Sequence, residues 1–220
     1  MVSRRCGTKI VRMHGIFRLG LLFLVMVSWG VSPVEAQQQA AQPPSAHEAA
    51  PPGKKANLTY ADRKAWYQIL KWPKEYEDDF DAGLGADKEK GWLKFYHLSP
   101  RQYLVEVQCQ MFAYQAGFVY LFYDEAATPP SSRVLNFETI SGEKGKQVQG
   151  QETLLVGFPE FDPARRELSV WQKGRGLGDC GTWALHRLED GRAALKEFRA
   201  KENCDGKYVD PKKYPRIFPK

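Results

Sequence analysis

The hydrophobic period of two that follows Gly91 is the feature that most limits the folds open to this chain. Residues 103–111 place an apolar side chain at every second position, which is the repeat of a β-strand with one buried face. Residues 118–123 (FVYLFY) are apolar or aromatic throughout, as expected for a central strand that is covered on both faces. The pattern predicts a half-buried strand at 103–111, with Cys109 on its core side, and a covered strand at 118–123.

Six further runs have the composition of strands, and turn residues separate them. The turns contain Pro, Gly and Asp, which favour reversal of the chain. The six runs are 92–98, 133–139, 152–158, 167–172, 181–188 and 193–200. Eight short strands with regular turn signals predict a mostly β fold, an antiparallel meander that forms a sandwich or a barrel.

A short helical segment precedes the strands. Thr59 is placed to cap a helix, and Asp62 follows three residues later in a capping-box arrangement. Apolar side chains recur at helical spacing between residues 65 and 70, and Pro73 ends the run. Pro73 is also placed to begin a second short helix at 74–80, whose early turns are acidic.

The first 36 residues have the layout of a secretory signal peptide. A basic head precedes an apolar run at 19–31, and a small-residue site follows at 34–36. The apolar run is shorter than the roughly 20 residues that span a bilayer. We expect cleavage near Ala36, export to the periplasm or the extracellular space, and no stable membrane span afterwards. An N-terminal anchor that is not cleaved is the alternative.

The segment behind the signal predicts a linker and then one domain. Residues 37–57 are Gln, Ala and Pro with almost no large apolar side chain, a composition typical of a disordered linker. Residues 58–220 are long enough for a single β-rich domain with its own core.

Most of the formal charge of +6 belongs to the signal. The first 36 residues hold five of the 32 basic residues and one of the 26 acidic residues, so the rest of the chain carries a net charge of +2. A charge this small does not favour nucleic acid as a partner.

The last predicted hairpin brings two cysteines toward each other. Its turn, Asp190-Gly191, suits a two-residue type I′ connection. Extending the register outward places Cys180 opposite Lys201, three residues before Cys204. We therefore predict a Cys180–Cys204 disulfide, which an oxidising compartment would allow to form.

The sequence predicts no metal, no cofactor and no catalytic residue. Cys109 is the odd thiol and is expected to be a small buried apolar side chain. The spacing of Cys and His matches no zinc pattern, and the acidic residues at 75–89 lack the Gly and Glu of a calcium loop. Cys180 and His186 lie on the same side of one strand, where six residues separate them by roughly 20 Å. A thiol and an imidazole that act together need hydrogen-bond distance.

The densest unusual stretch is KGRGLGDCG at residues 173–181. A dinucleotide-binding loop would open a helix at its end, whereas this stretch runs into a predicted strand. Its glycines therefore favour a tight connection between two antiparallel strands. The alternative is an anion-binding site, in which backbone N–H groups act together with Lys173, Arg175 and Asp179.

Residues 173–204, from KGRGLGDCGTWALHRLEDGRAALKEFRA to Cys204, resemble the signature of a bacterial exported family known only as domain-of-unknown-function family 1176. Three further pieces fit the resemblance: Trp72-Pro73, VEVQCQMFAYQ at 105–115 and FPEFDPARRELSVW at 158–171. The resemblance implies export and the Cys180–Cys204 pair. It also implies that relatives carry a Cys near Tyr76 as a partner for the residue that matches Cys109. It implies no activity.

Taken together, these features favour an exported, non-enzymatic binding or interaction module of the cell envelope, with an envelope protein or a glycan as its partner. Trp183 and Leu185 share one face of a predicted strand, where core packing is expected and a stacking surface is the alternative. The alternative function is a cell-envelope hydrolase with its site near residues 173–181, where Lys173, Arg175 and Asp179 would be the first candidates.

Overall fold

The computed structural model describes residues 53–219 apart from 55, 144 and 145, and for the rest of 141–148 it describes the backbone alone. The predicted signal peptide at 1–36 and most of the predicted linker at 37–57 lie outside the described residues. No helix within the described residues combines the length and the apolarity needed to cross a membrane.

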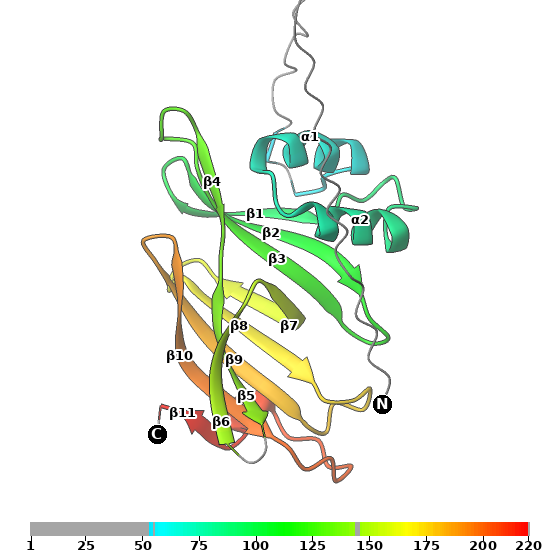
Figure 1. The fold of residues 1–220 in the computed structure, drawn as a ribbon, viewed down its shortest axis with the longest axis vertical. Coiled ribbons are helices and arrows are strands. Elements are labelled where there is room, and N and C mark those ends of the chain that lie inside the picture. The colour runs from blue at the N-terminus through cyan, green and yellow to red at the C-terminus, as the bar shows by residue number, and fades with distance from the viewer. Residues whose placement is uncertain (1–52, 55, 144–145, 220) are drawn as a thin grey trace, which may run out of the picture. The chain divides into compact units, whose positions relative to one another are not determined.

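Two helices precede a series of strands, as Figure 1 shows. The helices are α1 (Tyr60–Leu70) and α2 (Lys74–Gly83), and a 3₁₀ turn, η1, covers Pro211–Lys213. The strands are β1 (Leu93–Ser99), β2 (Gln102–Met111), β3 (Ala116–Asp124), β4 (Ser131–Val134), β5 (Phe137–Glu143), β6 (Lys146–Glu152), β7 (Leu154–Asp162), β8 (Glu167–Lys173), β9 (Gly181–Glu189), β10 (Arg192–Lys201) and β11 (Arg216–Phe218). Thr59 caps α1 in the predicted capping box with Asp62.

The strands form one mixed 11-stranded sheet. Its order is β1-β2-β3-β7-β8-β9-β10-β5-β6, with β4 paired to β3 and β11 paired to β10. The mostly β class is confirmed. The prediction of a purely antiparallel meander is wrong at one pair, because β5 runs parallel to β10 at Phe137 and Ala193. The order ends at β1 and β6, so the predicted sandwich or barrel is not confirmed.

Sequence patterning missed two strands and joined two others. β6 (KQVQGQE) is mostly polar, so it has no apolar repeat that would indicate a strand. It is defined by its pairing with β5 in a hairpin. β11 has three residues. The predicted strand at 133–139 is split, because its first part pairs with β3 as β4 and its second part continues to β10 as β5.

Strands β2 and β3 are buried on both faces, so the predicted half-buried strand at 103–111 is wrong. The odd-numbered side chains of β2 from Tyr103 to Cys109, which lies on the core side as predicted, pack in one core cluster with residues of α1. Leu104 packs in a second cluster with residues of β5, β7 and β8. Figure 1 shows the two helices beside β1–β3 and apart from β8–β10. Glu106 and Gln108 are therefore buried, although their alternation with apolar residues is typical of a solvent face.

A buried ion pair connects the helices to the sheet. Arg63 of α1 is fully buried, and its Nε donates to Oε2 of Glu77 in α2 at 2.9 Å. Its Nη1 donates to the carbonyl oxygens of Gly91 at 3.1 Å and Gln108 at 3.0 Å. Trp72 Nε1 donates to the same Glu77 oxygen at 3.0 Å. One guanidinium thus ties two helices, the segment before β1 and strand β2 together.

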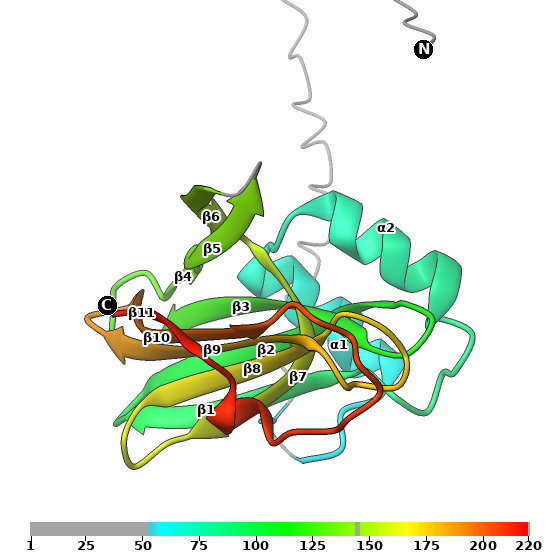
Figure 2. The ribbon, with the colours of Figure 1, turned by 90° about the horizontal axis from the view of Figure 1, so that it is seen from below.

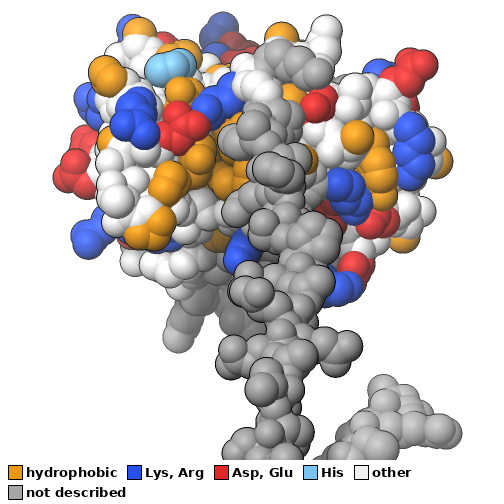
Figure 3. Space-filling view, turned by 90° about the horizontal axis from the view of Figure 1, so that it is seen from above, with side chains coloured by type: hydrophobic (Ala, Val, Ile, Leu, Met, Phe, Trp, Pro, Cys, Tyr) orange, Lys and Arg blue, Asp and Glu red, His pale blue; other side chains and the backbone are white. Residues whose placement is uncertain are grey.

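The surface carries charges of both signs. On the face that Figure 3 shows, the visible Lys and Arg side chains lie among Asp and Glu side chains. This is the distribution expected of a domain whose net charge is close to zero.

We predict that Glu77→Gln lowers the free energy of unfolding by about 3 kcal/mol, because it leaves the buried Arg63 charge without its counterion. Asp78→Asn is the matched control on the same helix. Its pair with Lys74 is exposed, so the expected loss is much smaller than in Glu77→Gln. Urea unfolding of both variants at constant m-value makes the comparison. Equal losses in the two variants would show that the buried pair contributes no more to the free energy of unfolding than the exposed pair does.

Candidate functional site

The Gly-rich stretch at 173–181 is a tight connection between antiparallel strands, as the glycine pattern indicates. Lys173, which ends β8, pairs with Gly181, which begins β9. Gly181 has φ of 146°, and a Cβ there would lie 2.1 Å from the Gln172 carbonyl oxygen. Only glycine fits this close approach of two backbones.

The predicted hairpin and disulfide are both present. Glu189 pairs with Arg192 across the Asp190-Gly191 turn, whose two residues have φ of 48° and 69°, as a type I′ turn requires. An irregularity in β10 between Leu195 and Glu197 shifts the register by one residue, so Lys201 pairs with Gly181 rather than with Cys180. The shift brings the cysteines nearer. Cys180 and Cys204 form a disulfide with their Cα atoms 4.9 Å apart.

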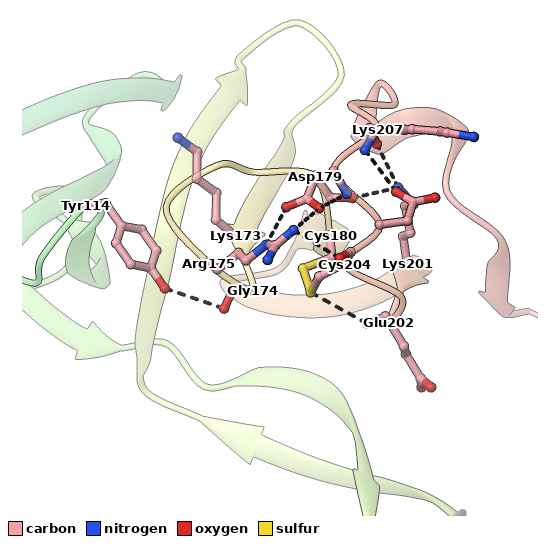
Figure 4. The surroundings of a disulfide bond; sticks show 12 residues. Tyr114, Lys173, Gly174, Arg175, Asp179, Cys180, Lys201, Glu202, Cys204 and Lys207 are labelled. Atoms are coloured by element: carbon pink, nitrogen blue, oxygen red, sulfur yellow. Dashed lines mark hydrogen bonds and ion pairs between the residues drawn. A yellow bond between two sulfur atoms is a disulfide. The ribbon is translucent and has the colours of Figure 1, made fainter.

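Asp179 reinforces this disulfide from the neighbouring position (Figure 4). Arg175 donates from Nε to Oδ1 at 2.8 Å and from Nη2 to Oδ2 at 2.6 Å, and the Gly206 N–H donates to Oδ2 at 2.6 Å. Arg175 Nη2 also donates to the Cys204 carbonyl at 3.0 Å. The bonds from Arg175, joined by the one from Gly206, hold the pKa of Asp179 well below its usual range. Asp179 and Cys180 together hold the segment after β10 against the Gly-rich connection.

The structure brings together only two of the three residues of the predicted anion site. Arg175 pairs with Asp179, whereas Lys173 extends away from that pair in Figure 4. The Lys173 ammonium lies 4.7 Å from the ring centroid of Phe158 and 5.1 Å from that of Trp171. Anion binding at Lys173, Arg175 and Asp179 stays a prediction, since an anion would have to compete with the Asp179 carboxylate for Arg175.

A different cavity gathers polar groups that no sequence motif indicated. It has a volume of about 650 Å³, and we call it the Glu106 pocket. It lies where the segment before α1 and the loop before β1 meet strands β1, β2, β3 and β7. Its lining residues are Ala56, Asn57, Leu58, Glu89, Lys90, Trp92, Leu93, Lys94, Glu106, Gln108, Phe118 and Pro159.

Glu106 is the buried titratable residue among those that line this pocket. It is 8% exposed. The hydroxyls of Tyr120 and Tyr96 donate to Oε2 at 2.9 Å and 3.2 Å, and Lys94 Nζ lies 4.0 Å from Oε1. Burial raises the pKa of Glu106 despite these donors. A carboxyl with a raised pKa in a cavity is a candidate for proton transfer or for hydrogen bonding to a ligand.

Two N–H donors of the same pocket have no partner among the described residues. These are Gln108 Nε2 and Trp92 Nε1, which are both buried atoms. Gln108 lies two residues beyond Glu106 on the same face of β2. Trp92 has φ of 50°, an unusual conformation for a bulky residue and one that is concentrated at functional sites. The pocket therefore offers one carboxyl group and two unused donors to a ligand.

Sequence reasoning missed this pocket because the even positions of β2 have the pattern of a solvent face. The neighbouring strand β3 nevertheless indicated that these positions are buried. Glu106 pairs with Tyr120 and Gln108 with Phe118, and the sequence predicts that residues 118–123 are covered on both faces. Polar residues that pair with a doubly covered strand share its burial.

Cys109 is the free thiol among the described cysteines, and it is fully buried. Burial raises the pKa of its thiol to about 12. Tyr76 packs against the same hydrophobic cluster, which is where the family resemblance implied a second cysteine in relatives.

Three comparisons bear on the identity of the chain. The sequence profile of a family described as "Protein of unknown function (DUF1176)" matches residues 25–219. The "Uncharacterized protein YpfG" of Escherichia coli (strain K12) is 38% identical over 71 residues, which is 31% of this chain. The chain thus spans only 20% of the length of that relative. No solved structure matches.

We predict that the Cys109 thiol is almost inert in the folded protein, because the thiolate is the reactive form and burial disfavours it. Thiol titration with Ellman's reagent on a Cys6→Ser variant without reductant should give one thiol per chain in guanidinium and a far slower reaction in native buffer. A fast native reaction would contradict the buried position, and three thiols in guanidinium would contradict the Cys180–Cys204 disulfide.

We predict that Glu106→Gln becomes increasingly stabilising relative to wild type as pH rises. The folded pKa of Glu106 lies above its ordinary value of 4.5, so the folded chain binds this proton more tightly than the unfolded chain does. Wild-type stability from this group is fully present below about pH 4.5 and is lost as pH rises through the raised pKa. Gln stays neutral throughout.

Thermal unfolding of wild type and Glu106→Gln from pH 4 to pH 8 measures the difference, with the exposed Glu160→Gln as the matched control. A difference that does not change with pH, or that has the opposite slope, would contradict the raised pKa.

Proposed function

Because the chain belongs to the family of proteins of unknown function DUF1176, membership assigns it no activity, and we propose one from its own residues. The protein is an exported, non-enzymatic binding module of the cell envelope. It binds a neutral, hydroxyl-rich ligand such as a glycan in the Glu106 pocket.

Export is supported by two features that are independent of the pocket. The first 36 residues have the basic, apolar and small-residue order of a signal peptide. The disulfide between Cys180 and Cys204 is of a kind that persists in the periplasm or outside the cell and is rare in the cytosol.

The observation that carries the binding proposal is the convergence of Glu106, Gln108 and Trp92 in one cavity. A sugar hydroxyl both donates and accepts hydrogen bonds. It can therefore donate to an oxygen of the Glu106 carboxyl group and accept from Gln108 Nε2 or Trp92 Nε1, which have no other partner within the described residues. The rings of Trp92 and Phe118 also line the cavity, and aromatic rings contribute apolar contact area to such sites.

Charge favours a neutral ligand over an anion. Lys94 lies 4.0 Å from Glu106, and Lys90 lies 3.3 Å from Asp87, so both cations beside the pocket already have acidic neighbours. Glu89 adds a second carboxylate to the lining.

The second candidate is a cell-envelope hydrolase, and the raised pKa of Glu106 is the observation that favours it. A protonated carboxyl can act as a general acid. The predicted enzyme site at residues 173–181 is the weaker version of this candidate, because Asp179 and Arg175 are engaged with each other.

The proposal predicts saturable binding of a disaccharide with quenching or enhancement of tryptophan fluorescence. Titration with N,N′-diacetylchitobiose, maltose and cellobiose, followed by fluorescence and calorimetry, tests it. Gln108→Leu removes one donor and should weaken binding about fivefold. Gln151→Leu, an exposed position outside the Glu106 pocket, should bind like wild type. Trp92→Phe should remove most of the fluorescence change.

Absence of both heat and fluorescence change with all three sugars would overturn the glycan proposal. Chromatography of the incubated sugars separates the two candidates. Cleavage by wild type that Glu106→Gln abolishes without weakening binding would establish the hydrolase and overturn the binding-only function.

A further inference from the structure

We propose that the protein has a second binding site, a cleft beside the disulfide that takes a neutral, mostly apolar molecule with one hydroxyl or amide N–H group. The cleft has a volume of about 460 Å³, within the range of small-molecule sites. We call it the His186 cleft. The His186 cleft and the Glu106 pocket share no lining residue, so the two proposed sites are independent of each other.

The floor of the cleft consists of small and apolar side chains from three neighbouring strands. Val170 of β8, Thr182 and Ala184 of β9 and Ala200 of β10 all line it. Thr182, Ala184 and Ala200 are only partly buried. These short side chains leave a hollow where larger ones would fill the face.

The β5–β6 hairpin forms the opposite wall. Figure 2 shows this hairpin standing away from β8–β10, and β5 joins β10 through a single pair of residues. Thr139 and Ile140 of β5 line the cleft across from the floor. The cleft is therefore a space between a sheet face and a projecting hairpin, with room for a slender ligand.

His186 lines this space and carries a hydrogen-bond acceptor that no described residue uses. Its Nε2 lies 2.9 Å from the Glu138 carbonyl oxygen, and a carbonyl can only accept, so Nε2 carries the hydrogen. Burial lowers the pKa of His186 and keeps the ring neutral. Nδ1 is then a lone-pair acceptor. It is buried without a partner among the described residues, in a residue that is 1% exposed.

The charges around the cleft exclude an anion as the preferred ligand. Lys201 lines the cleft, but its ammonium group donates to the carbonyls of Asp179 and Lys207 and to the Asp205 carboxylate, each at 2.7 Å. Glu152 and Glu202 contribute exposed carboxylates to the lining. A neutral apolar ligand with one donor would pack against the apolar floor and donate a hydrogen bond to Nδ1.

Three probes with a similar apolar chain test the assignment: 1-octanol, heptyl methyl ether and octanoate. The ether lacks the donor, and octanoate is an anion near neutral pH. Nitrogen-15 spectra of histidine-labelled full-length protein should show saturable movement of the His186 Nδ1 signal with 1-octanol. We expect the ether and octanoate to bind at least fivefold more weakly, about 1 kcal/mol.

Ala200→Leu fills the floor and should abolish the shift caused by 1-octanol. Ala194→Leu is the matched control, the same change on the same strand at an exposed position outside the cleft, and should bind like wild type. Gln108→Leu should also bind 1-octanol like wild type, which separates this site from the Glu106 pocket. Equal binding of alcohol and ether, tighter binding of octanoate, or unchanged binding in Ala200→Leu would overturn the proposal.

Discussion

The buried pair of Arg63 and Glu77 is the interaction on which the helical half of the domain and its pocket both depend. Besides its bond to Glu77, Arg63 donates to the carbonyls of Gly91 and Gln108. Gly91 directly precedes Trp92 in the chain, and Trp92 and Gln108 both line the cavity. Gly91 itself has no room for a side chain, because a Cβ there would lie 2.4 Å from the Thr59 carbonyl oxygen. A buried ion pair is costly to desolvate, and here the same charge also fixes the geometry of a polar cavity.

Strands β8 to β10 are joined by covalent and ionic links at the Gly-rich connection. Asp179, Cys180 and Gly181 follow one another and form, in that order, an ion pair, a disulfide and a close approach of two backbones. Cys180, Cys204, Gly174 and Gly181 also line the His186 cleft. The Gly-rich connection and the disulfide therefore form one wall of that cavity.

Sequence patterns predicted correctly those features that depend on a few neighbouring residues. The capping box of Thr59, the Asp190-Gly191 turn and the Cys180–Cys204 pair each depend on a few neighbouring residues or on one hairpin, and the structure confirms all three. The Glu106 pocket depended on which faces of β2 the rest of the chain covers, and that is decided by α1 on one side and by β5, β7 and β8 on the other. Strand β6 has no apolar repeat, so only its pairing with β5 defines it. Alternation in sequence reports burial only where one face of a strand meets water.

Two buried carboxyl groups, those of Asp179 and Glu106, have pKa shifts in opposite directions because their hydrogen-bond donors differ. Asp179 receives a bidentate guanidinium and a backbone N–H, and its pKa falls far below the ordinary value. Glu106 receives two neutral hydroxyls, with its nearest cation at 4.0 Å, and its pKa rises. Neutral donors stabilise a carboxylate less than a charged one does, so in Glu106 burial outweighs them. Asp179 is held in one set of contacts, whereas Glu106 lies in a cavity that also contains two unused donors. This contrast supports the proposal that a ligand contacts Glu106 rather than the more conspicuous Asp179.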